Sequence, residues 1–300
     1  MHNRKRIVIF NIILVCLSYI NLFFTIKRCT FAGGMKIVII GSGNLATQLA
    51  MALKDAGQHI LQVYSRAEEH ARLLAEKIGC KYTADIDGID GNADVYIISV
   101  KDDAISEIAA KVCDKTKDAV FVHTAGSISM DVLKGKAQHY GVLYPMQTFS
   151  KNRKVNFKPI PCFLEASDDE TLNIIRQLAE SISDNVVLAD SEKRKKIHLA
   201  AVLACNFTNH CYRLAEKVLQ EEKIDFNLFL PLIDETARKV SVLSPKQAQT
   251  GPMVRYDVGV MDMQKNLLSD DRTKQIYQLM AESIHEDATS ADDTCLRQEP

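Results

Sequence analysis

The hydrophobic positions between residues 35 and 188 fall into short runs that alternate with longer amphipathic stretches. The short runs are apolar throughout, which is typical of parallel strands buried on both faces of a sheet. The longer stretches have the apolar spacing of helices. Strands that alternate with helices predict an α/β domain with a doubly wound, mostly parallel sheet. The expected strands are Ile37–Ile40, His59–Tyr64, Val95–Val100, Ala119–His123, Gly141–Tyr144, Ile160–Glu165 and Val186–Leu188, and the expected helices include Ala67–Gly79, Ala104–Cys113 and Asp169–Ser183.

Beyond residue 190 the apolar positions recur at helical spacing as far as about residue 286. We therefore expect an α/β domain at 35–188 to be followed by an all-α helical domain at 189–286. The polar residues 287–300 are expected to form a frayed tail. The helices expected in the second domain cover about 191–222, Phe226–Leu243, about 257–268 and 270–286, and the breaker-rich segment Pro245–Pro252 is expected to connect two of them.

The first expected strand is followed at once by Gly41-Ser42-Gly43-Asn44-Leu45-Ala46 and then by a helical pattern. This is the G-x-G-x-x-A arrangement in the context that it requires. Gly41 allows a tight turn, Gly43 lets the backbone approach a pyrophosphate, and Ala46 keeps the helix close to the strand. We therefore expect a Rossmann-type dinucleotide site rather than a purely structural turn. The backbone N–H groups that would point at the phosphates are those of Ser42, Asn44 and Leu45.

The second expected strand ends in Ser65-Arg66. A site for NAD usually has an acidic residue here, which binds the ribose hydroxyls. Arg66 is instead suited to a 2′-phosphate, which a carboxylate would repel. We therefore expect NADP rather than NAD, with Ser65 and Arg66 at the adenosine ribose. The alternative is a solvated arginine that opens the next helix.

Polar clusters follow several other expected strands, at the edge of the sheet where such folds bind ligands. They begin at Val100, at His123 and at Tyr144. Gly126 would let a nicotinamide ring approach the backbone, and Ser127 and Gln147 can form hydrogen bonds to a substrate. For each of these residues a role in capping a loop is the alternative.

The long helix expected at about 191–222 carries polar side chains on an otherwise apolar stripe. Buried polar groups of this kind need partners. These side chains either bond to one another or to another helix, or they line a cleft against the first domain. In a cleft, His198 would be suited to proton transfer near neutral pH. At about 100° per residue, the residues that share one arc are His198, Val202, Cys205, Asn206 and Asn209.

The cysteines and the overall charge exclude several classes of protein. The eight cysteines form no C-x-x-C pair, and no histidine pair has zinc-finger spacing, so we expect neither a metal site nor a disulfide framework. Scattered cysteines in apolar runs are typical of reduced, cytosolic thiols. We expect Cys113, Cys162 and Cys205 to be buried. The net charge of −1 gives no reason to expect a nucleic-acid partner.

The first 34 residues differ from the rest of the chain. They contain five bases and no acid, which leaves 32 bases and 38 acids, a net charge of −6, in residues 35–300. Ile7–Phe24 carries no charge, and as a helix it would be about 27 Å long, close to the thickness of a hydrocarbon core. The segment is open to three interpretations: a signal peptide, a membrane anchor through residues 7–26, or a true start at Met35. We favour the start at Met35 and a cytoplasmic protein.

Taken together, these motifs resemble the domain-of-unknown-function 2520 family, whose members have a Rossmann-like domain and a helical C-terminal domain. The resemblance covers about residues 35–285. It implies kinship with pyrroline-5-carboxylate reductases, deazaflavin-dependent NADP oxidoreductases and the 6-phosphogluconate dehydrogenase group, and a homodimer built through the helical domain. The segments that carry it are Gly41–Ala46, His123–Ser127, Tyr144–Phe149, His198–Phe207, and Thr250-Gly251-Pro252 with Arg255 and Asp257.

The sequence also departs from its relatives. Many members have His where Tyr144 stands and Gly where Tyr256 stands. The Lys and Asn pair of the related hydroxyacid dehydrogenases is missing, because Leu199 follows Lys195 at the required spacing and Ala200 follows Lys196. That catalytic pair cannot be carried over.

The function that we expect is an NADP(H)-dependent oxidoreductase acting on a small C=O or C=N substrate. A non-catalytic NADP(H)-binding or sensing protein is the alternative, and a membrane-tethered form of either depends on residues 1–34. His198 is expected to donate or accept the proton. Of the remaining residues, Asn206 and Gln147 are expected to orient the substrate, Ser127 and Thr250 to lie beside the nicotinamide, and Asn209, Thr250 and Arg255 to bind the substrate.

Overall fold

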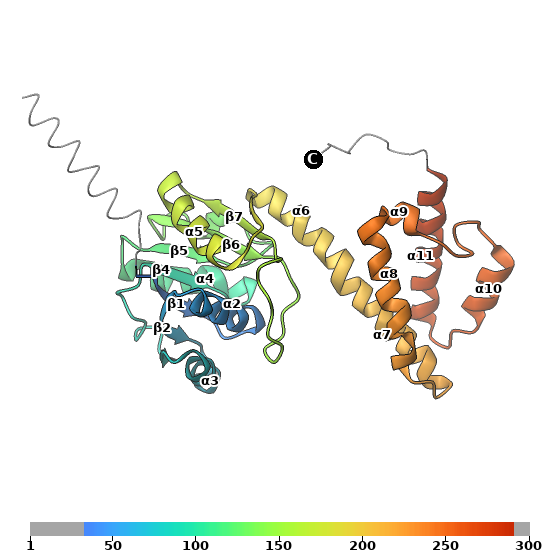
Figure 1. Ribbon diagram of the computed structural model, residues 1–300, viewed down its shortest axis with the longest axis horizontal. Coiled ribbons are helices and arrows are strands. Elements are labelled where there is room, and N and C mark those ends of the chain that lie inside the picture. Colours follow the sequence, from blue (N-terminus) through green and yellow to red (C-terminus); the bar gives the residue numbers. More distant parts are fainter. Residues whose placement is uncertain (1–32, 291–300) are drawn as a thin grey trace, which may run out of the picture. The chain divides into compact units, whose positions relative to one another are not determined.

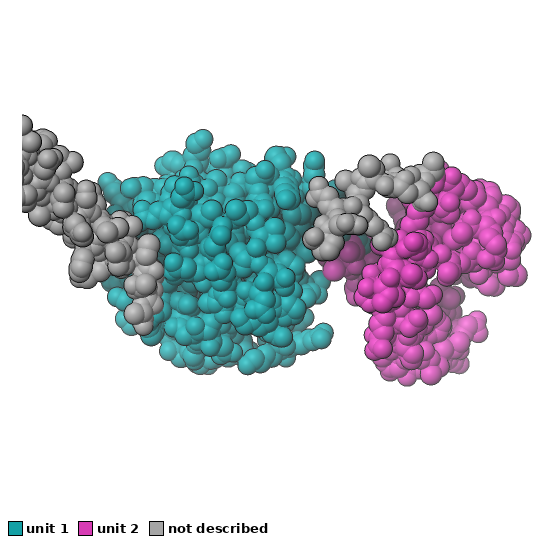
Figure 2. All heavy atoms as spheres, turned by 45° about the horizontal axis from the view of Figure 1, so that its top comes forward, with its two compact units in different colours: residues 1–203 teal, residues 204–300 magenta. Residues whose placement is uncertain are grey.

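The computed structural model describes residues 33–290, which form two compact units, one ending at Leu203 and the other beginning at Ala204 (Figure 2). The change from strands to helices comes earlier, because the last strand ends at Leu188 and every later element is helical. The expected order, a sheet-containing part followed by an all-helical part, is confirmed. The proposed leader and membrane anchor lie outside the described residues.

The first unit contains one sheet with the strand order β3-β2-β1-β4-β5-β6-β7-β8 (Figure 1). All neighbouring strands are parallel except β6 and β7, so the expected doubly wound, mostly parallel sheet is confirmed. One strand, β3, was not predicted, and the strand expected to reach Val100 ends at Ile98. The strands are β1 (Lys36–Ile40), β2 (His59–Tyr64), β3 (Lys81–Thr83), β4 (Val95–Ile98), β5 (Val120–His123), β6 (His139–Pro145), β7 (Cys162–Ala166) and β8 (Val186–Leu188).

Helices cover both faces of this sheet, and strand β1 shows why its residues are all apolar. Ile37 and Ile39 pack into the core formed with α2, α3 and α5, whereas Val38 and Ile40 pack into the core formed with α4. A strand buried on both faces has no polar side, as the continuous run predicted. The helices are α2 (Asn44–Asp55), α3 (Glu68–Ile78), α4 (Ile105–Val112) and α5 (Asp169–Ile182).

The long helix expected at about 191–222 is interrupted by a π-helical turn at Val202–Phe207. The expected connection Pro245–Pro252 contains a short helix, and the last helix continues to Thr289, three residues beyond its expected end. The rest of the expected tail, from residue 291 onward, lies outside the described residues. Pro231 lies in the first turn of its helix, where its missing N–H disrupts no helical hydrogen bond. The helices are α6 (Ser191–Ala201), α7 (Thr208–Glu221), α8 (Leu230–Val242), α9 (Pro245–Ala248), α10 (Val258–Asn266) and α11 (Asp271–Thr289).

The helical unit buries few apolar side chains by itself. Among its described residues, the buried apolar ones are Leu219, Met261 and Ala281. Cys113 and Cys162 are buried as expected, whereas Cys205, which was also expected to be buried, is exposed. Within residues 33–290, no helix has the length and apolar character needed to cross a membrane.

Candidate cofactor and substrate site

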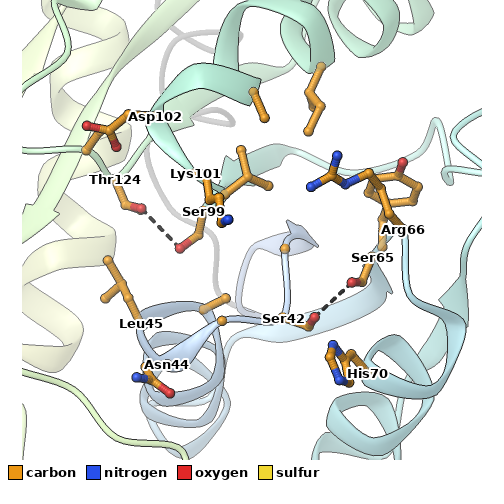
Figure 3. A pocket seen from close by; sticks show the side chains of 18 of the residues that line it. Ser42, Asn44, Leu45, Ser65, Arg66, His70, Ser99, Lys101, Asp102 and Thr124 are labelled. Atoms are coloured by element: carbon orange, nitrogen blue, oxygen red, sulfur yellow. Dashed lines mark hydrogen bonds between the residues drawn. The ribbon is translucent and has the colours of Figure 1, made fainter.

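A pocket of about 580 Å³ opens at the carboxyl ends of the parallel strands in the first unit. Its walls come from the glycine loop after β1, the ends of β2, β4, β5 and β6, and helix α6 (Figure 3). This is the edge at which open α/β sheets bind their ligands. The polar clusters predicted at these strand ends therefore lie at one site.

The glycine loop is shaped for a close backbone approach. Gly41 has a φ of +124°, and a Cβ atom there would lie 2.0 Å from the carbonyl oxygen of Ser99. Gly43 precedes α2 in an extended conformation, and, apart from its two chain neighbours, no residue has an atom within 4 Å of the position a Cβ would occupy. No side chain caps the N-terminus of α2. The first N–H groups of this helix are thus available to an anion, as phosphate sites of this type require.

The end of β2 forms a polar, partly basic wall of the pocket. Ser42 Oγ donates a hydrogen bond to Ser65 Oγ at 2.8 Å, and both residues lie close to Arg66 and His70 (Figure 3). Among the described residues, Asp102 is the one acid that lines the pocket. His70 was missed by the sequence analysis. It lies in the first turn of α3, the helix that directly follows Ser65 and Arg66.

The ends of β4 and β5 meet on another side of the pocket. Thr124 Oγ1 donates to Ser99 Oγ at 3.1 Å, and Val100 lies in the wall beside them. Ser127 does not line the pocket itself. Its hydroxyl donates to Asp102 Oδ2 at 2.5 Å, and Asp102 does line the pocket.

Two aromatic rings meet over the backbone of Gly126. Tyr144 Oη and His198 Nδ1 share a hydrogen bond of 3.0 Å, and their rings contact edge to face at 71° with centroids 5.9 Å apart. A Cβ atom on Gly126 would lie 2.6 Å from His198 Nδ1 and 2.9 Å from Tyr144 Cζ. Only glycine leaves room for both rings here. Tyr144 was not predicted as a site residue, although it ends a strand at the binding edge.

Helix α6 is fixed to the sheet by a buried ion pair one turn before His198. The side chain of Arg194 is 0% exposed, and it bonds to Glu165, to the carbonyl oxygen of Ile128 and to Ser191 Oγ. Glu165 also accepts bonds from the N–H of Ser191 at 3.0 Å and from its hydroxyl at 2.8 Å. Arg194 therefore joins β7, the loop after Gly126 and the start of α6.

His123 lies beneath this cluster at the end of β5, completely buried. Burial, followed by the nearby charge of Arg194, lowers its pKa to about 4. At neutral pH its ring is uncharged, and its Nδ1 accepts a hydrogen bond from the N–H of Ala125 at 3.2 Å. His123 is therefore part of the support beneath the pocket rather than a second proton donor in it.

Among the predicted site residues of the first unit, Gln147 does not line this pocket. Gln147 is exposed, and its side-chain oxygen accepts a bond from the N–H of Thr148 at 2.8 Å. The π-helical turn at Val202–Phe207 departs from the 100° spacing that the predicted arc through His198 assumed. The residues that belong to the second unit, whose roles stay predictions, are Asn206, Asn209, Thr250 and Arg255.

Comparison with known proteins supports the assignment of the fold. Residues 36–126 match the family model of coenzyme F420-dependent NADP oxidoreductases, and residues 160–284 match a domain of unknown function, DUF2520. The solved structure of a candidate NADP oxidoreductase from Bacteroides fragilis is 50% identical, with a TM-score of 0.82 over 85% of this chain and 99% of its own. A protein from Thermotoga maritima is 25% identical, with a TM-score of 0.70 over 85% of this chain and 100% of its own.

More distant similarities extend the same pattern. A pyrroline-5-carboxylate reductase from Coxiella burnetii shares the fold at 18% identity, with a TM-score of 0.53 over 85% of this chain and 97% of its own. A glycerol-3-phosphate dehydrogenase [NAD(P)+] from Lysinibacillus sphaericus is 29% identical over 112 residues, and the chain spans about a third (33%) of the length of that curated relative.

The sheet, the glycine loop and the pocket at its edge define a Rossmann-type dinucleotide-binding protein. Together with the matches to both domains, they show that the chain belongs to the NAD(P)-dependent oxidoreductases in which a Rossmann-type domain is followed by a DUF2520 domain.

Proposed function

We propose that this protein is an NADP(H)-dependent oxidoreductase that acts on a small C=O or C=N substrate. The observation that carries the proposal is the Tyr144–His198 pair, which lies in the same pocket as the glycine loop. A proton-donating pair and a dinucleotide site in one pocket are the two parts that a carbonyl or imine reduction needs.

The residues present fit a nicotinamide dinucleotide. The open space at Gly43 and the uncapped α2 suit its phosphates, and the wall formed by Ser42, Ser65, Arg66 and His70 suits a 2′-phosphate. Arginine at this position supports NADP over NAD. The bound cofactor supplies the hydride, whereas the chain supplies orientation and the proton.

The Tyr144–His198 hydrogen bond provides a path for that proton. Tyr144 lines the pocket, and its hydroxyl can donate a proton to a substrate oxygen or nitrogen that gains negative charge. His198 Nδ1, 3.0 Å away, can return a proton to the tyrosine oxygen. His198 thus acts as the proton source through Tyr144, in a geometry that suits general acid catalysis.

A non-catalytic NADP(H)-binding or sensing protein is the second candidate. The observation that favours it is the absence of a lysine of α6 from the pocket, since Lys195 instead pairs with Glu192 at 2.7 Å on the exposed side of the helix. The lysine used by related dehydrogenases therefore has no counterpart among the described residues of α6 that line the pocket, and the lysines that do line it are Lys101 and Lys151.

The deciding experiment follows NADPH consumption by the wild-type protein across a panel of small aldehydes, ketones and imines. We expect consumption with at least one substrate class, and a Tyr144→Phe variant to lose about 100-fold or more in kcat while binding NADPH normally by calorimetry. Leu73→Ala, at an exposed position of α3 outside the pocket, serves as the control. Tight binding of NADPH without turnover on any substrate would favour the sensor.

We also propose a homodimer and a cytoplasmic location. The helical unit leaves large apolar side chains exposed, among them Leu228, Leu232, Val242 and Leu267, which a second copy of the chain would cover. Every cysteine within the described part of the chain is a free thiol, and this supports a reducing compartment.

A further inference from the structure

The loop between β6 and β7 carries a basic segment that the sequence analysis did not use. Residues 150–154 read Ser-Lys-Asn-Arg-Lys, with three bases and no acid. Of these residues, only Lys151 lines the cofactor pocket, in company with Gly43, Asn44 and Leu45 of the phosphate-binding turn. Lys151 is half-buried, whereas Arg153 and Lys154 are exposed.

This loop is fastened to the side of α2. Gln48 lies one turn into that helix and is 3% exposed, and its amide Nε2 donates to the carbonyl oxygen of Ser150 at 2.7 Å and lies 3.4 Å from that of Lys151. A second contact joins Lys154 Nζ to Asp55 Oδ2 at 3.3 Å. The backbone of Lys151 therefore lies beside the first turns of α2 rather than in free solvent.

The ends of the loop are also held together. The rings of Phe149 and Phe157 stack with centroids 5.5 Å apart and planes at 24°. Phe157 belongs to the main core of the α/β unit, and Phe149 packs against it. Because its base and its middle are both fixed, the loop presents Lys151 with a reduced loss of conformational entropy on binding.

We propose that Lys151 binds the pyrophosphate shared by NAD and NADP, and that Gln48 holds it in place. This inference rests on the proposed dinucleotide function. The α2 N–H groups and a lysine ammonium in the same pocket would neutralise a doubly charged diphosphate better than either could alone. Arg66 follows the end of β2, at the wall assigned to the 2′-phosphate. The two cations therefore have separable roles.

Calorimetric titration with NADPH and with NADH tests this division. We expect Lys151→Ala to weaken the binding of both dinucleotides equally, by about 10-fold, the loss typical of one charge-assisted hydrogen bond. Arg66→Ala should weaken NADPH alone. Arg153→Ala also removes one positive charge from this loop, but Arg153 is exposed and does not line the pocket. It should change the affinity for neither NADPH nor NADH. Lys151→Arg should recover most of the lost affinity.

Gln48→Ala provides an independent test, because it keeps Lys151 but removes the side-chain amide that bonds to the backbone of Ser150 and Lys151. We expect it to weaken both dinucleotides by a smaller factor than Lys151→Ala, with circular dichroism showing an unchanged fold. The inference is overturned if Lys151→Ala binds both dinucleotides as Arg153→Ala does, or if it affects NADPH alone. A wild-type protein that binds neither dinucleotide would instead overturn the proposed function, and Lys151 with it.

Discussion

At the scale of single residues, the protein places a histidine where protonation is costly. His123 is 0% exposed and lies near the guanidinium of Arg194, so its pKa falls to about 4. In the unfolded chain an ordinary histidine has a pKa of about 6.5. The unfolded form therefore takes up a proton first as the pH falls, which favours unfolding.

We therefore predict that the α/β unit loses unfolding free energy through His123, on the order of 2–3 kcal/mol, between pH 7.5 and pH 4.5. Urea unfolding at the two pH values measures the change. A His123→Asn variant should lack this part of the pH dependence, whereas His59→Asn, at an exposed histidine, should retain it. The same pH dependence in wild type and His123→Asn would contradict the prediction.

At the scale of elements, α6 is joined to the sheet by the buried ion pair between Arg194 and Glu165. Removing Arg194 would leave Glu165, which is 15% exposed, with only the two Ser191 donors among its described partners. An uncompensated buried charge is strongly destabilising, whereas a surface ion pair contributes little.

An Arg194→Met variant should accordingly lose about 3–5 kcal/mol of stability. Its neighbour Lys195, whose pair with Glu192 is exposed, offers a matched control, because Lys195→Met should cost less than about 1 kcal/mol. Denaturant midpoints of the two variants give the comparison. Equal losses of stability in Arg194→Met and Lys195→Met would contradict the prediction that burial makes the Arg194–Glu165 pair the more important of the two.

The elements also show what the sequence could and could not predict. Strand β1 and the glycine loop were predictable because their pattern is local. Strand β3 was missed because Lys81-Tyr82-Thr83 is short and has no apolar run. The π-helical turn was missed because a π-helix does not follow the α-helical period that the prediction assumed.

The candidate site was predictable only in part, for a related reason. The cofactor residues from Gly41 to Arg66 lie in one motif and its following strand. Tyr144 and His198 are 54 residues apart, and Lys151 reaches the pocket through Gln48, more than 100 residues earlier in the chain. Pairings across such separations are set by tertiary packing, which a periodic pattern does not record.

At the scale of the whole molecule, the two units differ in how completely they bury their apolar residues. The sheet has a large core on each face, whereas the helical unit leaves Leu232 61% and Leu279 67% exposed. This exposed apolar surface supports the proposed homodimer.

Light scattering after size exclusion should therefore give about twice the mass of one chain. The double variant Leu232→Glu with Leu279→Glu should shift the protein toward the monomer, because each charge would have to be buried in the interface. Leu73→Glu, which changes an exposed leucine of the α/β unit, should leave the dimer intact. A monomeric wild-type protein at micromolar concentration would exclude the homodimer.

Helix α6 contacts the antiparallel pair of strands β6 and β7 at two points, and the spacing of these points is similar along the strands and along the helix. Along the antiparallel pair, Glu165 lies opposite Val142, and Phe163 lies opposite Tyr144. Helix α6 bonds to the first level through Arg194 and to the second through His198. Two strand residues span roughly 6.6 Å, and four helical residues roughly 6 Å. The two contacts are therefore almost equally spaced along the strand and along the helix. A residue inserted between Phe163 and Glu165, or between Arg194 and His198, would displace His198 from Tyr144 while the Arg194–Glu165 ion pair stayed intact.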